Sequence, residues 1–113
     1  MKPEHEELLR RLALNDEVTA ETVLGTILRS PDETGLHAKT HALARVAALV
    51  AAESALASYL WAVASALAAG ASEDDIVDVL IAVAPIVGLA RLAAAAPQLA
   101  VALGYDVAPT STA

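Results

Sequence analysis

The chain has no cysteine. This absence excludes disulfide bonds, thiol nucleophiles, peroxidatic thiols and thiolate metal ligands together, because each of them requires a cysteine sulfur. Basic residues are also few, since 7 lysines and arginines stand against 14 aspartates and glutamates and the formal net charge is -7. The basic residues form no stripe of the kind that binds phosphates, so we expect no nucleic-acid partner.

Large aromatic side chains are scarce, with no Phe, one Trp and two Tyr among 113 residues. Hydrophobic residues nevertheless make up 57% of the chain, and most of them are small, alanine above all. Small apolar residues favour closely spaced helices, and this much apolar surface offsets the entropy cost of ordering the chain. The sequence therefore predicts one all-α domain, a compact bundle of about five to six helices.

Residues 54–72 carry no charge and are near the length of a membrane-spanning helix. They are mainly Ala and Ser and lack a basic flank, which favours burial inside a helical assembly over insertion into a membrane. The first residues, MKPEHEE, are acidic where an export signal is basic and then apolar. We therefore expect a cytoplasmic protein that is not inserted in a membrane.

Helix signals divide the chain into an arm with a loop (1–35), a helical core (36–107) and a frayed tail (108–113). In the arm we expect an amphipathic helix over 6–14 and a second helix that Thr19 caps and that ends near Arg29. Proline and glycine in residues 30–35 predict a break before the core.

Within the core, helices are expected over about 38–52 and 54–69, followed by one that begins after the cap Ser72. Gly70 is the expected left-handed end of the preceding helix. Pro85 should bend or end the helix after Ser72, and Gly88 should join it to a last helix that Gly104 stops.

The helix over 54–69 is apolar all round, so its two sides receive different roles. One stripe is the expected core contact, and the other presents small or weakly polar groups that suit a second helix, a partner subunit or a small ligand. The core stripe is Leu56, Leu60, Val63 and Leu67, and the opposite stripe is Ser54, Ser58, Trp61, Ala62 and Ser65.

Three core segments occur in a recognisable order: LHAKT at 36–40, GASEDDIVDVL at 70–80 and PIVG at 85–88. The most specific piece is ALAAGASEDDI at 66–76, a small-residue helix end followed by Gly, a cap and an acidic first turn. Over Leu36–Leu103 this order resembles the carboxymuconolactone decarboxylase family, which includes the alkylhydroperoxidase D-like proteins. The resemblance implies an alkylhydroperoxidase D-like helical fold that assembles as a homo-oligomer, a trimer or hexamer.

The same resemblance places the peroxidase motif Cys-x-x-Cys-x-x-x-His on Ala55, Ser58 and Ala62, so both thiols and the histidine are absent. Ser58 does not replace a thiol, because its hydroxyl is far less acidic. The decarboxylase branch also has its histidine at the position of Ala62. The resemblance therefore implies fold and assembly more strongly than chemistry.

Other polar residues supply candidates for a site. His37 and His41 have the spacing of two metal ligands, but no third ligand follows, so neither a metal nor another cofactor is predicted. His41, Arg45 and Glu53 are expected on one polar line, either a solvated face or a site that exchanges a proton. Arg91 is expected to bridge subunits or to hold an anion. The catalytic candidates are His41, Glu53 and Arg91.

Three functions remain open at this point. The first is a small organic ligand held in a pocket on the Ser54–Ser65 helix by Ser54, Ser58, Trp61 and Ala62, with Trp61 alternatively an anchor in the core or an interface. The second is a purely structural, homo-oligomeric assembly module. The third is a divergent decarboxylase or isomerase-like enzyme.

Overall fold

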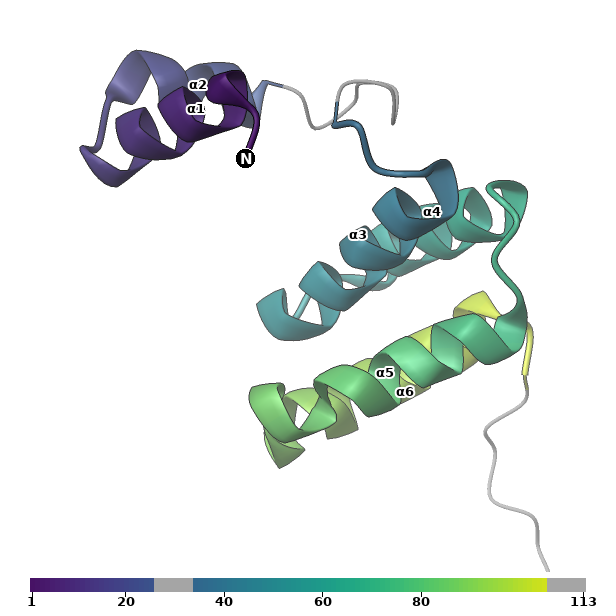
Figure 1. Cartoon of the computed structure of the whole chain (residues 1–113). Coiled ribbons are helices and arrows are strands. Elements are labelled where there is room, and N and C mark those ends of the chain that lie inside the picture. The colour runs from purple at the N-terminus through teal and green to yellow at the C-terminus, as the bar shows by residue number, and fades with distance from the viewer. Residues whose placement is uncertain (26–33, 106–113) are drawn as a thin grey trace, which may run out of the picture.

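The computed structural model describes residues 1–25 and 34–105, which fold into six α-helices and no β-strand (Figure 1). An all-α fold is therefore confirmed for the described residues. Helices α1 and α2 pair as a hairpin at the N-terminus, and the other four form the body. The helices are α1 (Pro3–Ala13), α2 (Glu17–Leu24), α3 (Ala38–Ala52), α4 (Leu56–Ala68), α5 (Glu73–Val87) and α6 (Leu89–Ala102).

The arm differs from expectation in both helices. Helix α1 begins at Pro3 and ends at Ala13 rather than covering 6–14, and α2 differs at its start and its end. Asp16, not Thr19, is the N-cap: its carboxylate accepts hydrogen bonds from the backbone N–H of Val18 at 3.1 Å and from the Thr19 hydroxyl at 2.9 Å. Aspartate takes this role because the extended backbone before the first turn aims its carboxylate at the free N–H groups. The helix ends at Leu24 rather than near Arg29, which lies with residues 30–33 outside the described part.

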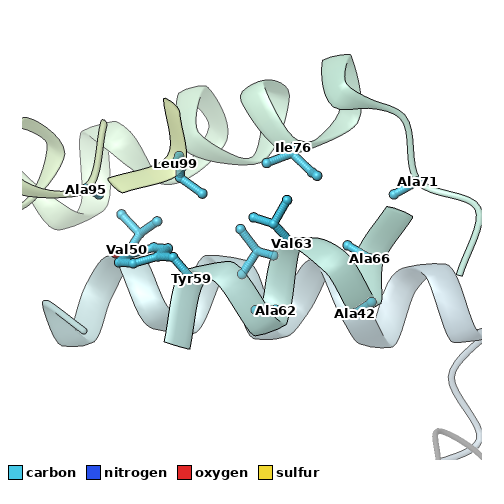
Figure 2. Packing of buried hydrophobic residues seen from close by; sticks show 11 residues of the cluster. Ala42, Val50, Tyr59, Ala62, Val63, Ala66, Ala71, Ile76, Ala95 and Leu99 are labelled. Atoms are coloured by element: carbon cyan, nitrogen blue, oxygen red, sulfur yellow. The ribbon is translucent and has the colours of Figure 1, made fainter. Parts of the chain in front are cut away.

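The body consists of two layers, with α3 and α4 in one and α5 and α6 in the other. Helix α3 packs on α5, and α4 packs on α6. Figure 2 shows Val50 and Val63 pointing from the first layer toward Leu99 and Ile76 of the second. The buried cluster is Ala42, Val46, Val50, Tyr59, Ala62, Val63, Ala66, Ala71, Ile76, Ala95 and Leu99.

Helix α4 presents a different stripe to the core from the one expected. Of the predicted stripe only Val63 is buried, whereas Leu56, Leu60 and Leu67 are 36%, 46% and 40% exposed. The buried positions of α4 are Tyr59, Ala62, Val63 and Ala66. These residues also have helical spacing, and their alanines allow the neighbouring helices to approach closely, which explains why the leucines face outward.

Helix ends in the body follow the sequence signals. The Ser72 side chain accepts from the N–H of Asp75 at 3.0 Å, and the Asp75 carboxylate accepts from the N–H of Ser72 at 2.9 Å, a reciprocal capping box. Gly70 has φ +99° directly after the α4 C-cap. Gly88, at φ +86°, is both the last cap of α5 and the first cap of α6.

Neither proline inside a helix ends it. Helix α5 continues through Pro85 to Val87, and α6 continues through Pro97 to Ala102. Gly104, at φ +81°, follows the C-cap of α6 as expected. Tyr105 then returns to the start of α5, where its hydroxyl donates a 2.9 Å hydrogen bond to the Glu73 carboxylate. The predicted tail, 108–113, lies outside the described residues.

Candidate functional site

A hollow of about 500 Å³ lies where α3 meets α4. Helix α3 contributes three residues within little more than one turn, and α4 contributes four from its first two turns. Apart from one guanidinium, one hydroxyl and one indole N–H, the side-chain groups that line it are apolar. The lining residues are Arg45, Ala48, Leu49, Ala57, Ser58, Trp61 and Ala62.

Arg45 and Trp61 contact one another in the wall of this hollow. The guanidinium carbon of Arg45 lies 5.9 Å from the centre of the Trp61 ring, within the range of a cation–π contact. Trp61 is 52% exposed, so one part of the only tryptophan in the chain remains open to solvent. The contact crosses from α3 to α4 and holds two flat groups at one side of the hollow.

The three cationic side chains of residues 34–105 differ in their partners. Lys39 lies 3.1 Å from the carboxylate of Asp75, and Arg91 lies 3.8 Å from that of Glu53. Arg45 has no carboxylate within salt-bridge distance among the described residues. Its positive charge is therefore not neutralised by this part of the chain.

The hollow brings together three of the four residues expected to bind a ligand. Ser58, Trp61 and Ala62 line it, with Ala62 at its buried base, 3% exposed. Ser54 does not line the hollow; it precedes α4, and its backbone N–H donates to the Leu49 carbonyl oxygen at 3.3 Å. Ala55 is the N-cap of α4.

The expected polar line on α3 is not formed. His41 is buried, 8% exposed, Arg45 contacts Trp61, and Glu53 caps α3 in the left-handed conformation at φ +53°. Glu53 pairs with Arg91 of α6, which also donates weakly to the Val87 carbonyl oxygen at 3.5 Å. Arg91 was expected to bridge subunits or hold an anion, and here it contacts a carboxylate of its own chain.

The Glu53–Arg91 pair is about half exposed on both sides. Exposed ion pairs of this kind contribute little to stability because water screens them. The pair lies outside the lining of the α3–α4 hollow, and His41 does not line that hollow either. The three catalytic candidates therefore do not converge on the site that the ligand-binding candidates share.

The lining residues from α3 were not all expected. Arg45 was singled out for a different arrangement, whereas Ala48, Leu49 and, on α4, Ala57 were missed. Arg45, Ala48 and Leu49 have the spacing of one helix face, which is the available signal. Which helix that face meets depends on how α3 and α4 pack, and no motif specifies it.

Other possible sites were sought in the described residues. Within 1–25 and 34–105, no three histidine, aspartate or glutamate side chains gather in a way that would hold a metal ion. No described helix is both long enough and apolar enough to cross a membrane. A second hollow, of about 310 Å³, lies between α5 and α6 beside Tyr105, and the hydrogen bond to Glu73 raises the pKa of that tyrosine.

Comparison of the chain with models of known families, with curated proteins and with solved structures finds no match. The α3–α4 hollow and the side chains that line it are therefore the basis for a functional proposal.

Proposed function

We propose that this protein binds a small organic molecule in the hollow between α3 and α4. The observation that carries the proposal is the combination of an apolar hollow of about 500 Å³ with one cation and one hydroxyl at its wall. Small-molecule sites typically measure about 300–1,000 Å³ and combine an apolar lining with a few polar groups. Trp61 adds a large flat surface against which a ligand can pack.

The resemblance to the carboxymuconolactone decarboxylase family supports the same location. Ser58 and Ala62, which occupy the positions of the family's second thiol and its histidine, both line the hollow. On this proposal the chain is a member of that group in which the reactive side chains are replaced by a hydroxyl and a methyl. The location of the site is retained, while thiol chemistry is excluded because the chain has no cysteine.

The proposal can be tested by a substitution that fills the hollow with a larger side chain at an exposed position. Ala48 lines it and is exposed, so Ala48→Phe should block the hollow with little effect on the core. Ala44 is exposed one turn earlier on α3 and does not line the hollow, so Ala44→Phe is the matched control. We expect mass spectrometry of the purified protein to find a bound small molecule in the parent chain and in Ala44→Phe, but not in Ala48→Phe.

Equal loading of the two phenylalanine variants would contradict the proposed site. An empty parent protein would be examined by following Trp61 fluorescence against a panel of small aromatic and aliphatic compounds. Since Trp61 is the only tryptophan, any change reports from the wall of the hollow. If no compound of the panel changed the fluorescence of the parent chain, this result would contradict ligand binding and favour the assembly function described next.

The second candidate is a homo-oligomeric assembly module, a trimer or hexamer. It is favoured by large apolar side chains on the outside of the body, among them Leu60 at 46%, Ile81 at 63%, Ile86 at 86% and Leu89 at 81% exposure. Such faces mark interaction surfaces when they adjoin one another. Light scattering should give a mass of several chains, and a stable monomer at micromolar concentration would contradict assembly.

A further inference from the structure

We infer that the ligand of the α3–α4 hollow is a monoanion with a flat apolar body, such as an aromatic carboxylate, whose charged group binds Arg45 and whose body packs against Trp61. This inference rests on the proposed function and specifies the chemical class of its ligand.

The charge of the ligand follows from the state of Arg45. The other two cations in residues 34–105 each have a carboxylate partner. Arg45 has none among the described residues, although the chain carries 14 acidic residues, and it lies at the wall of an apolar hollow. Because Arg45 is only partly buried and has no counter-charge in this part of the chain, its guanidinium is available to pair with an anion that enters the hollow.

The N–H groups of Arg45 favour a carboxylate in particular. The cation–π contact with Trp61 does not use them, and they make no hydrogen bond to another described residue, so they can donate to a ligand. A carboxylate accepts two parallel hydrogen bonds from such an edge, which is the strongest arrangement for this pair. Trp61 therefore positions Arg45 as well as offering surface to the ligand.

The other residues that line the hollow indicate the polarity and size of the uncharged part of the ligand. Beyond Arg45, the side-chain polar groups in the wall are the Ser58 hydroxyl and the indole N–H of Trp61, both uncharged, and the other residues contribute methyl and isobutyl groups. A second charge on the ligand would meet apolar surface without a partner. A hollow of about 500 Å³ has room for one or two fused rings.

The experiment compares three probes of nearly equal shape: 2-naphthoate, the neutral 2-naphthamide and the cationic 2-naphthylmethylammonium. Calorimetry and Trp61 fluorescence measure each dissociation constant in the parent chain. We expect 2-naphthoate to bind about tenfold more tightly than the amide, which corresponds to one charge-assisted contact, and the cation to bind most weakly. Higher salt should narrow the difference between the naphthoate and the amide.

Three variants test whether Arg45 causes the preference for naphthoate over naphthamide. Arg45→Gln should weaken naphthoate binding about tenfold and weaken amide binding much less, so that the two affinities converge. Arg45→Lys retains the charge and should preserve part of the preference. Arg91→Gln removes the same group from a position outside the hollow, where it already has the Glu53 partner, and should change neither probe.

The outcomes separate the two proposals. Equal binding of naphthoate and naphthamide, both abolished by Ala48→Phe, would retain the ligand site and overturn the anion inference. A preference that survives Arg45→Gln would also overturn the inference. Failure of all three probes, together with a change of oligomeric state in Ala48→Phe but not Ala44→Phe, would identify the hollow as a contact between copies of the chain and overturn both proposals.

Discussion

The hydroxyl group of Tyr59 donates a 3.0 Å hydrogen bond to the backbone carbonyl oxygen of Leu49. The Tyr59 residue is buried, 1% exposed, and desolvation raises the pKa of its phenol, so the hydroxyl retains the proton that it donates. The same carbonyl oxygen accepts from the N–H of Ser54 at 3.3 Å. Tyr59 thus ties α4 to the last turn of α3, the two helices that form the hollow.

Replacing Tyr59 by Phe should destabilise the protein by about 1 kcal/mol, because the ring remains packed while one buried hydrogen bond is lost. Urea unfolding followed by circular dichroism measures this change. Tyr105→Phe is the control, since it removes an equivalent hydroxyl from an exposed hydrogen bond to Glu73, where water replaces the partner. A Tyr59→Phe variant as stable as the control would show that the Leu49 contact contributes nothing.

The lowered pKa of Asp75 should make the stability of the protein depend on pH. Hydrogen bonding to the Ser72 backbone N–H, and secondly to Lys39, lowers the pKa of this carboxyl below its ordinary value of 3.8. A folded-state pKa below that of the unfolded chain means that the contribution of Asp75 is fully present above the unfolded value and is lost as pH falls through the folded value. Comparison of the parent chain with Asp75→Asn isolates this contribution from the other carboxylates.

We therefore expect the parent chain to melt at a higher temperature than Asp75→Asn near neutral pH, with a constant difference down to about pH 5. Below the ordinary carboxyl pKa of 3.8 the difference should shrink, because Asp75 takes up a proton in the parent chain. Asp78→Asn, on the same helix but without a resolved contact, is a suitable control. Melting curves that remain equally separated across the acid range would contradict the role of Asp75.

Replacing Gly88, at the joint between α5 and α6, by a residue with a Cβ should strain the backbone. Its backbone angles, φ +86° and ψ 170°, belong to a region that residues with a Cβ scarcely enter. A Cβ at this position would have no atom within 4 Å apart from residue 88 and its two chain neighbours, so the cost of a side chain is one of backbone strain rather than of crowding. Gly88→Ala should therefore destabilise the protein by about 1–3 kcal/mol.

Gly25→Ala is the matched control, because Gly25 has φ -67°, an angle that alanine adopts freely. Differential scanning calorimetry should show a lower melting temperature for Gly88→Ala and almost none of that change for Gly25→Ala. Equal melting temperatures for the two variants would mean that the joint relaxes without cost.

Local signals in the sequence predicted the helix boundaries of the body well. Helix α3 has the bounds expected for it, and Ser72, Gly70 and Gly88 act as the caps and joint that were expected of them. Each of these depends on hydrogen bonds and backbone angles within a few residues, which the sequence specifies directly. The predicted N-cap of α2 was wrong by three residues, because Asp16 and Thr19 are both acceptable cap residues. The extended backbone at Asp16 makes that residue the N-cap.

Packing between helices was predicted less well. Helix α4 is apolar all round, so its sequence contains two acceptable core stripes, and contact with α3 and α6 selects the one with Tyr59 and Ala66. The burial of His41 and the meeting of Arg45 with Trp61 depend on the same contacts. Ser58, Trp61 and Ala62 were expected together because they share one helix, whereas the α3 side of the hollow requires the tertiary structure.

The last prediction concerns the positions that the family resemblance assigns to two thiols. Ala55 is the N-cap of α4, and the N–H of Ser58 donates to its carbonyl oxygen at 3.0 Å, which closes the first turn. A disulfide requires Cα atoms about 4.4–6.8 Å apart, and residues three apart in a helical turn meet this requirement. The double variant Ala55→Cys/Ser58→Cys should therefore form a disulfide under mild oxidation.

A thiol at a helix N-terminus should also be more acidic than an ordinary one, because the free N–H groups stabilise the thiolate. The control is Ala64→Cys/Leu67→Cys, two exposed positions with the same spacing at the C-terminal end of α4, away from its N-terminal N–H groups. Alkylation rates measured across pH give the thiol pKa of each reduced pair, and we expect a lower value at 55 and 58. Equal pKa values, together with a pair that stays reduced, would show that this turn lacks the thiol-activating geometry and would remove the support that the alignment gives to the proposed site.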